Sequence, residues 1–383
     1  MRIAYVTHAR LPSKAANAVQ TLKMVDALGA AGHDVVLLAR PGDDVDIAAA
    51  FGVHRGLPLH TFAADGPRGL RTARWLRRLR RHVRDFAPEL VYSRDLWSLC
   101  AVADLDIPMC FEAHWSPRLV PRLRLALLAL TARRNFVRIV AISHALRDEL
   151  LSLLPGLDPS AVIVVPSAAD DVADVAPAAL SGQGRLRVGY AGQLYDGKGA
   201  ELLAPIATRL ADIDLHVVGG EDADIARWRA RAPGNVIFHG HRPHAEVPAF
   251  LAAFDVVLAP YQPAVVVSGG AEVARWMSPL KVFEYMAMSR AIVASDLPVL
   301  RESLVDEQSA LLVGAGDVEA WCAAIDRLRD PSLRTKLGAG ARCAFVAAHT
   351  WPQRAASILK DLPPSSTTRT ALQRAWSSLG SLR

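Results

Sequence analysis

The sequence predicts an α/β protein made of two Rossmann-like domains, each built on a parallel sheet. Strand-like apolar runs alternate with amphipathic helical segments along most of the chain, which is typical of parallel sheets. The alternation stops within residues 170–184, which are rich in Asp, Ala, Pro and Gly, and then restarts. A length of 383 residues is enough for two domains of ordinary size.

These observations divide the chain into four regions. We predict an N-terminal domain over 1–169, a linker over 170–184, a second domain over 185–350, and a C-terminal helix and tail over 351–383. The helix would pack back on the N-terminal domain, and the tail would fray from about Pro363 onward, where the sequence loses its periodicity.

In the first domain, strands are expected at residues 2–9, 31–40, 89–95, 109–115, 138–143 and 162–170, with helices at 18–31, 68–84, 118–133 and 144–151. In the second domain, strands are expected at 186–191, 215–220, 235–240, 255–261, 291–296 and 310–314, with helices at 201–210, 247–254, about 278–288 and 318–330. Ligands of such folds bind at the carboxyl ends of the strands and often between domains.

Composition favours a cytoplasmic protein with sizeable cores. Hydrophobic residues make up 51% and charged residues 21% of the chain. We expect no membrane-spanning run and no signal peptide, because the N-terminus enters a strand at once. The four cysteines lack metal or redox spacing, so we interpret them as reduced core thiols.

The net charge of +6 is unevenly distributed, because eight arginines fall between Arg68 and Arg84. Trp75 and Val83 belong to an apolar stripe at helical spacing beneath them. Two interpretations remain open. The helix has a solvated basic face, or it attracts anionic lipid headgroups or an acidic acceptor, which would place the protein peripherally at the inner face of the membrane. Nucleic acid is not expected, since aromatic interleaving is missing.

Residues 278–296, SPLKVFEYMAMSRAIVASD, are the most informative stretch. Ser278 is suited to cap a helix and Pro279 to occupy its first position. The free N–H groups of the first turn would then form an anion site. Glu284 shares a helix face with Leu280 and Phe283, where a solvated carboxylate is not expected. Phosphate at the helix start and hydroxyls at Glu284 would together describe a nucleoside diphosphate.

Three further segments could carry chemistry. The loop GQLYDGKG contains Gly192, Gln193 and Lys198 and follows an apolar strand, so it is either a second phosphate contact or a glycine turn with a solvated lysine. Glu112 and His114 fall on one face at the end of a strand, so the histidine either points into the cleft or is structural.

The loop after the first strand could line an acceptor pocket or simply connect strand to helix. Its candidate residues are Ser13, Lys14 and Asn17. No spacing suggests a metal site: the Glu112–His114 pair lacks a third ligand, and no Asp-x-Asp pair precedes a strand as metal-dependent sugar transfer would require. No cofactor is expected beyond the donor substrate.

These motifs resemble the family-four retaining glycosyltransferases, which have the GT-B fold of two Rossmann-like domains facing across a deep cleft. The resemblance is carried by SPLKVFEYMAMSRAIVASDLPVLRE, by AGHDV after the first helix, by AISHAL before the linker, and by the glycine loop ending at Lys198. It covers nearly the whole chain, as far as the helix near Trp351.

The resemblance implies a role for several residues. Lys198 would hold the donor diphosphate, the backbone at Leu280 and Lys281 would meet its phosphates, and Glu284 would bind the two ribose hydroxyls. His114 matches the cleft histidine that contacts the donor sugar near the reacting centre. Ser143 matches the end of the last N-terminal strand, with no role implied.

Two positions depart from the family pattern. Trp276 stands eight residues before Glu284, where relatives often carry a glutamate near the sugar hydroxyls, and Glu272 would replace it only with a shifted loop. Gln193 stands where many relatives carry an arginine beside the diphosphate.

The resemblance therefore implies transfer of a sugar from a nucleotide-diphosphate sugar to a glycan, lipid-linked or small-molecule acceptor, with retention and without a metal. A cell-envelope polysaccharide pathway would suit such an enzyme. Two alternatives are a GT-B sugar-nucleotide epimerase and a non-catalytic nucleotide-sugar binding protein. The epimerase needs acid and base groups around the sugar ring, of which only His114 is evident. The binding protein is suggested by Trp276 and Gln193.

Overall fold

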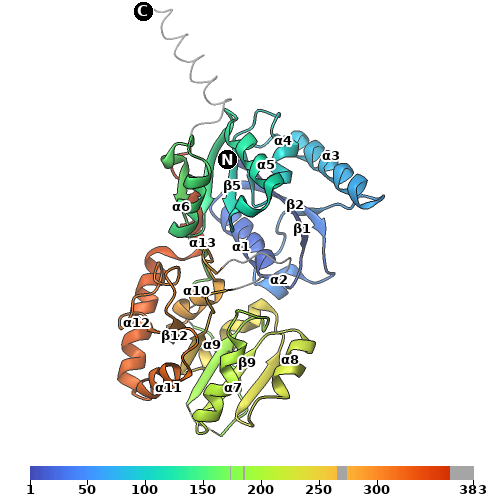
Figure 1. The fold of residues 1–383 in the computed structure, drawn as a ribbon. Helices are drawn as coiled ribbons and strands as arrows, with labels where there is room; N and C mark the ends of the chain where they lie inside the picture. Colours follow the sequence, from blue (N-terminus) through green and yellow to red (C-terminus); the bar gives the residue numbers. More distant parts are fainter. Residues whose placement is uncertain (173, 184–185, 265–273, 363–383) are drawn as a thin grey trace, which may run out of the picture.

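Two parallel sheets, each in its own domain, form the computed structural model of the chain (Figure 1). The structure describes residues 1–383 except 173, 184–185, 265–273 and 363–383. The predicted tail beyond Pro363 and the alternative carboxylate Glu272 therefore lie outside the described residues. The α/β class and the two Rossmann-like domains are confirmed.

The first sheet has seven strands in the order β3-β2-β1-β4-β5-β6-β7. Its strands are β1 (Arg2–Leu11), β2 (Asp34–Pro41), β3 (Leu59–Thr61), β4 (Leu90–Ser93), β5 (Met109–Ala113), β6 (Phe136–Ala141) and β7 (Val162–Val164). The helices between them are α1 (Ala16–Ala30), α2 (Ile47–Phe51), α3 (Arg68–Phe86), α4 (Leu96–Val102), α5 (Pro121–Thr131) and α6 (His144–Leu153), with short 3₁₀ turns η1 (Pro117–Leu119) and η2 (Pro159–Ala161).

The second sheet has six strands in the order β10-β9-β8-β11-β12-β13. They are β8 (Arg187–Ala191), β9 (Asp214–Val218), β10 (Val236–Gly240), β11 (Val256–Ala259), β12 (Ala291–Ser295) and β13 (Leu311–Val313). Around them lie α7 (Ala200–Arg209), α8 (Asp222–Arg229), η3 (His244–Glu246), α9 (Val247–Ala253), α10 (Leu280–Ala287), α11 (Val318–Arg327) and α12 (Pro331–Ala348). A last helix, α13 (Trp351–Leu359), follows α12.

The central strands of both sheets are buried on both faces, whereas the edge strands β3 and β10 are partly exposed. In β1, Ala4 and Val6 join one apolar cluster while Ile3 and Tyr5 join another. Each sheet thus separates two cores. The cysteines follow the prediction only in part: Cys110 and Cys322 are buried, whereas Cys100 and Cys343 are exposed free thiols on helical surfaces.

The arginine-rich helix has the predicted amphipathic form. Trp75, Leu79 and Val83 of α3 are buried in the core. The exposed arginines of the helix are Arg71, Arg74, Arg77, Arg78, Arg81 and Arg84. Part of the positive charge is used locally. Arg74 donates to Asp65 O at 2.8 Å, and Arg80 forms an ion pair with Asp104. Among the described residues no helix is long and apolar enough to cross a membrane.

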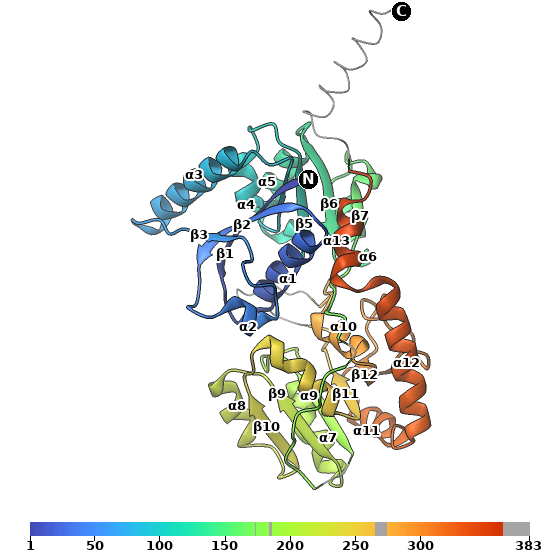
Figure 2. The ribbon, with the colours of Figure 1, turned by 180° about the vertical axis from the view of Figure 1, so that it is seen from behind.

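The chain passes between the domains at two adjacent places. Ala169, at the end of the first domain, forms a β-bridge with Thr350, and its N–H donates to His349 O at 3.0 Å. After this second crossing α13 lies against α1, where Trp351, Ala355 and Ile358 join the core of the first domain (Figure 2). The C-terminal helix thereby completes the first domain.

Replacing Trp351 by Ala should lower the free energy of unfolding by about 3–5 kcal/mol, because it removes a buried aromatic side chain between α13 and α1. Urea denaturation would measure the change. The exposed Val346 on α12 provides a control, and Val346→Ala should change stability by no more than about 0.5 kcal/mol. If the two substitutions changed the free energy of unfolding equally, α13 would not be part of the stabilising core of the first domain.

Candidate active site

Two lysine side chains from different elements of the second domain converge on the same aromatic ring. Lys198 lies in the loop between β8 and α7, and Lys281 is the second residue of α10. Each Nζ lies 4.9 Å from the centre of the Tyr261 ring, and Lys281 Nζ is also 3.8 Å from that of Tyr190. The faces of the aromatic rings attract the ammonium groups, but they carry no negative charge that would neutralise them.

Lys281 is buried, Lys198 is half-buried, and the charge of the pair is only partly compensated. Lys281 is 8% exposed, and within the described part of the chain its Nζ has no hydrogen-bond partner. Burial, followed by repulsion from Lys198, holds the pKa of Lys281 well below its usual range, although Glu284 opposes this shift. Burial also lowers the pKa of Lys198 to about 8. An anion that entered between the lysines would stabilise the charged form of both.

Glycines leave room for the lysines. Gly192 has a φ of 146°, and a Cβ there would lie 3.0 Å from Lys281 Nζ. Gly199, with a φ of 84°, lies so close to Pro260 that a Cβ would be 1.9 Å from the carbonyl oxygen of that residue. The position of the neighbouring Gln193 is fixed by a hydrogen bond, because its main-chain carbonyl accepts from Tyr190 Oη at 2.6 Å. The loop therefore brings backbone and ammonium groups together as the sequence suggested.

The start of α10 differs from the prediction. The helix begins at Leu280, Pro279 precedes it, and no side chain caps it. Ser278 is turned away from the helix and accepts from the backbone N–H of Ser167 at 2.8 Å, because the chain of the first domain passes beside it. The first intrahelical bond in this turn is donated by Val282, so the N–H groups of Leu280 and Lys281 have no helical acceptor.

Glu284 lies further along α10 and is partly buried. Its Oε1 is 2.9 Å from Nε2 of His244, a residue of η3 that the sequence did not single out. The two residues line a small, mostly apolar pocket with Asp170, Val247, Leu251 and Met288. One carboxylate oxygen of Glu284 is thus oriented by His244, which leaves the other for a ligand hydroxyl.

His114 and Glu112 face one another at the end of β5, as their spacing predicted. His114 Nε2 is 2.5 Å from Glu112 Oε1, and Gln20 Nε2 lies 2.7 Å from the same oxygen. Burial, followed by the charge of Arg94, lowers the pKa of His114 to about 4, although Glu112 opposes this. The imidazole is therefore neutral near pH 7.

The predicted acceptor loop lies beside this histidine. Asn17 is exposed on the first turn of α1, and its carbonyl accepts from Arg94, which also donates to Gln20 Oε1. Ser13 is half-buried and Lys14 exposed. The charge of Lys14 acts across to the second domain, because burial and then this charge lower the pKa of His241. The loop thus borders the space between the domains.

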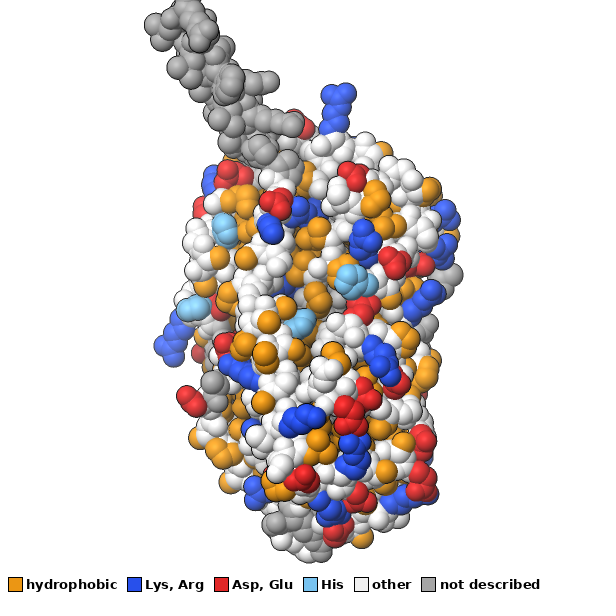
Figure 3. Space-filling view, turned by 90° about the vertical axis from the view of Figure 1, so that its left-hand side faces the viewer, with side chains coloured by type: hydrophobic (Ala, Val, Ile, Leu, Met, Phe, Trp, Pro, Cys, Tyr) orange, Lys and Arg blue, Asp and Glu red, His pale blue; other side chains and the backbone are white. Residues whose placement is uncertain are grey.

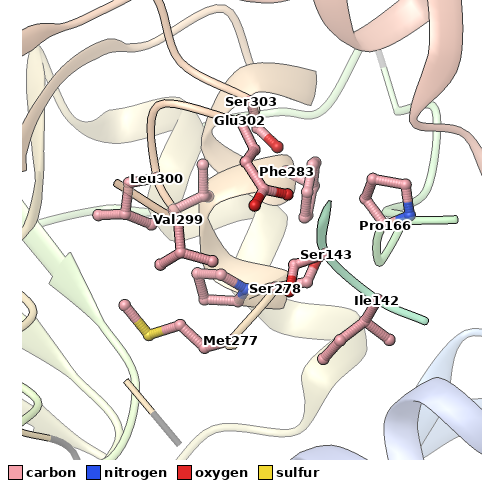
Figure 4. Close-up of a pocket in the computed structure, with 12 residues that line it drawn as sticks. Ile142, Ser143, Pro166, Met277, Ser278, Phe283, Val299, Leu300, Glu302 and Ser303 are labelled. Atoms are coloured by element: carbon pink, nitrogen blue, oxygen red, sulfur yellow. The ribbon is translucent and has the colours of Figure 1, made fainter. Parts of the chain in front are cut away.

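Ser143 lies at the contact between the domains, beside Met277 and Ser278 (Figure 4), and Trp276 belongs to the same contact. Ser143 Oγ donates to the carbonyl of Trp276 at 3.0 Å, and the indole packs on the core of the first domain. Nearby, Glu302 accepts from the N–H groups of His144 and Ala145 at 2.8 and 3.1 Å. Position 276 is an apolar interface position here, which is incompatible with a carboxylate pointing toward a sugar.

The site residues thus fall into three groups: Lys198, Lys281 and the glycine loop; Glu284 with His244; and His114 with Glu112, Gln20 and Arg94. Sequence reasoning missed His244, Gln20 and Arg94, because their roles depend on contacts between distant segments. From the sequence, only the backbone of Lys281 was expected to contact phosphate. The motif SPLK, however, already shows that a lysine side chain follows the start of this helix, in addition to Lys198 of the glycine loop. Among the described residues no group of three or more His, Cys, Asp or Glu side chains could hold a metal.

Comparison with known proteins gives the family. The sequence model for "Glycosyltransferase Family 4" matches residues 18–172, and the one for "Glycosyl transferases group 1" matches residues 185–330. A search of curated proteins found no match.

Solved structures share the fold. Sucrose-phosphate synthase from Thermosynechococcus elongatus is 18% identical over 98% of this chain and 99% of that one, with a TM-score of 0.73. HepE from Anabaena, in complex with UDP and glucose, is 16% identical over 94% and 99%, with a TM-score of 0.71. WaaG, a glycosyltransferase involved in lipopolysaccharide biosynthesis, is 14% identical over 94% and 100%, with a TM-score of 0.63.

The two family models cover most of both domains, and these structures share the two-domain fold. The chain belongs to the family-four, group 1 glycosyltransferases and has the GT-B fold.

Proposed function

We propose that this glycosyltransferase moves a sugar from a nucleotide-diphosphate sugar to a glycan, lipid-linked or small-molecule acceptor, with retention of configuration and without a metal ion. The observation that carries the proposal is the pair of converging lysines, of which Lys281 is buried and Lys198 half-buried. Burial disfavours the charged form of both ammonium groups, so the pair favours a ligand whose negative charges would restore it, and a diphosphate has at least two such charges. HepE, a structure with the same fold, binds UDP-glucose, which supports this donor class.

The lysine pair would stabilise the leaving group. As the bond between the sugar carbon and the phosphate oxygen breaks, negative charge grows on the diphosphate, beside Lys198, Lys281 and the free N–H groups at the start of α10. Such groups are already oriented before the reaction and therefore favour the transition state. They would supply the charge that a metal supplies in other transferases.

Glu284 would bind the ribose hydroxyls through the oxygen that His244 leaves free, and the pocket beside it would hold the nucleoside. His114 would contact the donor sugar. The acceptor hydroxyl, held near Ser13, Lys14 and Asn17, would attack from the face that the diphosphate leaves, and its proton would pass to the departing phosphate oxygen. A bond forms on the face from which one breaks, so configuration is retained.

The outer surface of the first domain supports a second partner, an anionic lipid surface. Arg71, Arg77, Arg81 and Arg84 of α3 are exposed, and the neighbouring helices expose Trp97, Leu125 and Leu128. Basic and apolar side chains together suit the headgroup region of a bilayer. By contrast, acidic and basic side chains are interspersed over the second domain on the face in Figure 3. We propose that α3 brings the enzyme to a membrane-bound acceptor.

A screen of uridine, guanosine, adenosine and thymidine diphosphate sugars by thermal shift should identify the donor. With that donor, Lys198→Ala and Lys281→Met should each lower turnover by about 10²–10³, because each removes one charge from the leaving-group site. Both should weaken binding of the nucleoside diphosphate but leave binding of the nucleoside unchanged.

Two controls sharpen this test. Lys336→Ala on the exposed side of α12 should leave turnover unchanged. Adding Gln193→Arg to Lys281→Met should recover part of the lost activity, because it returns a cation to the same loop. Absence of binding to any nucleoside diphosphate by the parent protein would refute the proposed function.

Affinity for the nucleoside diphosphate should fall as pH rises through about 8. Lys198 has a pKa of about 8 in the free protein, so below that pH it is charged and attracts the diphosphate, and above it the charge is lost. Phosphate is already ionised in this range and adds no slope of its own. Titration calorimetry between pH 7 and 9.5 would measure the decline, and Lys198→Arg should make it shallower. A flat profile in the parent would contradict the assignment of Lys198.

Arg77→Glu with Arg81→Glu should weaken binding to phosphatidylglycerol vesicles on the order of tenfold or more, since each basic residue near such a surface contributes about 1 kcal/mol. Sedimentation at low and moderate salt would measure it. Arg231→Glu with Lys336→Glu makes the same charge change on the second domain and should have little effect. Absence of binding by the parent at low salt would remove the membrane proposal.

A further inference from the structure

A buried charge network connects the C-terminal helix to His114. Glu112 of β5 and Arg354 of α13 are each 1% exposed and form an ion pair with 3.0 Å between Oε1 and Nη2. More than two hundred residues separate them along the chain. Two charges buried in this way are costly unless each is fully compensated, so their partners identify what the network holds in place.

The side chains that contact Glu112 donate hydrogen bonds to it or carry positive charge. Oε1 accepts from Gln20 and from His114 Nε2, and Oε2 accepts from Tyr92 Oη and from Arg354 Nη1 at 3.3 Å. Arg354 is held in turn, because its Nε donates to Pro166 O at 2.9 Å, just before the chain leaves the first domain. Burial alone would raise the pKa of Glu112, but Arg354 and His114 hold it well below the usual range.

The ionised carboxylate determines which nitrogen of His114 carries the proton. A carboxylate can only accept, so the proton of the neutral ring must be on Nε2, which faces Glu112. Nδ1 lies on the other side of the ring and keeps its lone pair. It can accept a hydrogen bond from a hydroxyl group but cannot donate one.

We propose that Arg354 is a positioning residue of the transferase: through Glu112 it fixes the Nε2–H tautomer and the orientation of His114, so that Nδ1 accepts a hydrogen bond from a hydroxyl of the bound sugar. The inference rests on the proposed function for the sugar contact. The C-terminal helix is thereby part of the active-site apparatus as well as part of the core.

A purely structural role for Arg354 would predict something else. A second buried arginine, Arg138 of β6, fastens the same helix by donating to the carbonyls of Ile358 and Lys360 at 2.8 and 2.6 Å. It is not among the residues that touch Glu112. Loss of Arg138 should therefore loosen α13 and leave His114 unchanged, whereas loss of Arg354 should change both.

The charged and titratable groups around His114 set the expected direction of the change. Arg94 and Arg354 lower its pKa, and Glu112 raises it. The buried hydroxyls of Tyr92 and Tyr5 lie in the same network and stay protonated, because burial raises the pKa of both. Arg354→Gln removes one cation and leaves Glu112 to share a proton with the ring, so His114 should titrate at higher pH than in the parent.

The experiment uses nitrogen-15 NMR of histidine-labelled full-length protein, with the His114 signal assigned by its loss in His114→Gln. The parent should show an Nε2–H tautomer that does not titrate between pH 6 and 8.5. Arg354→Gln should show mixed tautomers or titration in this range, with kcat lower by about 10-fold to 100-fold and a smaller change in KM. Arg354→Lys should restore part of the Nε2–H tautomer and part of kcat. Arg138→Gln should lower stability while keeping the parent tautomer and kcat.

Parent-like tautomer and kcat in Arg354→Gln, or equal changes in Arg138→Gln, would overturn the proposal. If Arg354→Gln does not fold, the pair Glu112→Met with Arg354→Met removes both buried charges and the oxygen acceptor of His114 at once, and a retained tautomer there overturns it too. The two levels of inference can be separated. A parent protein that transfers no sugar contradicts the proposed function, whereas the tautomer readings still test the network.

Discussion

The ion pair between Glu112 and Arg354 is the interaction on which the arrangement of the first domain and of its side of the cleft depends. Removing one partner of such a pair would leave an uncompensated charge in the core, at a cost of about 3–5 kcal/mol. The pair therefore requires α13 to lie against α1 and requires the carboxylate to stay ionised. His114 and Gln20 are arranged around that carboxylate. One buried contact thus sets both the tertiary position of a helix and the chemistry of a side chain in the cleft.

The second domain has the opposite electrostatic character. Lys198 and Lys281 converge among tyrosine rings, and Glu284 partly offsets the charge of Lys281. The carboxylate of Glu112 accepts hydrogen bonds from side chains of the protein itself, whereas Lys281 Nζ has no hydrogen-bond partner among the described residues. The first kind of site contributes orientation, and the second contributes attraction for charge. A transferase needs both, because it must hold one substrate rigidly and release charged products.

The features that depend on residues close together in the sequence could be predicted from it. Strand–helix alternation gave two sheets, period two placed Glu112 and His114 on one face, and the glycine loop predicted the location of Lys198. The sequence was insufficient where distant segments meet. Ser278 has good capping chemistry, but Ser167 competes for its hydroxyl across the domain boundary. Nothing in the sequence around Arg354 distinguishes it from other helical arginines. Its partner Glu112 becomes evident only because α13 packs against the first domain. Trp276 was recognised as a departure, yet the reason, contact with the other domain's core, is purely tertiary.

The double crossing at Ala169 and Thr350 limits how the two domains can move. A single connecting strand would allow one domain to swivel about the chain axis, but two strands joined by a bridge resist twisting and shear. Bending about an axis through the bridge is therefore the motion that we expect to meet the least resistance. Such bending would bring the histidine side and the lysine side of the cleft toward one another.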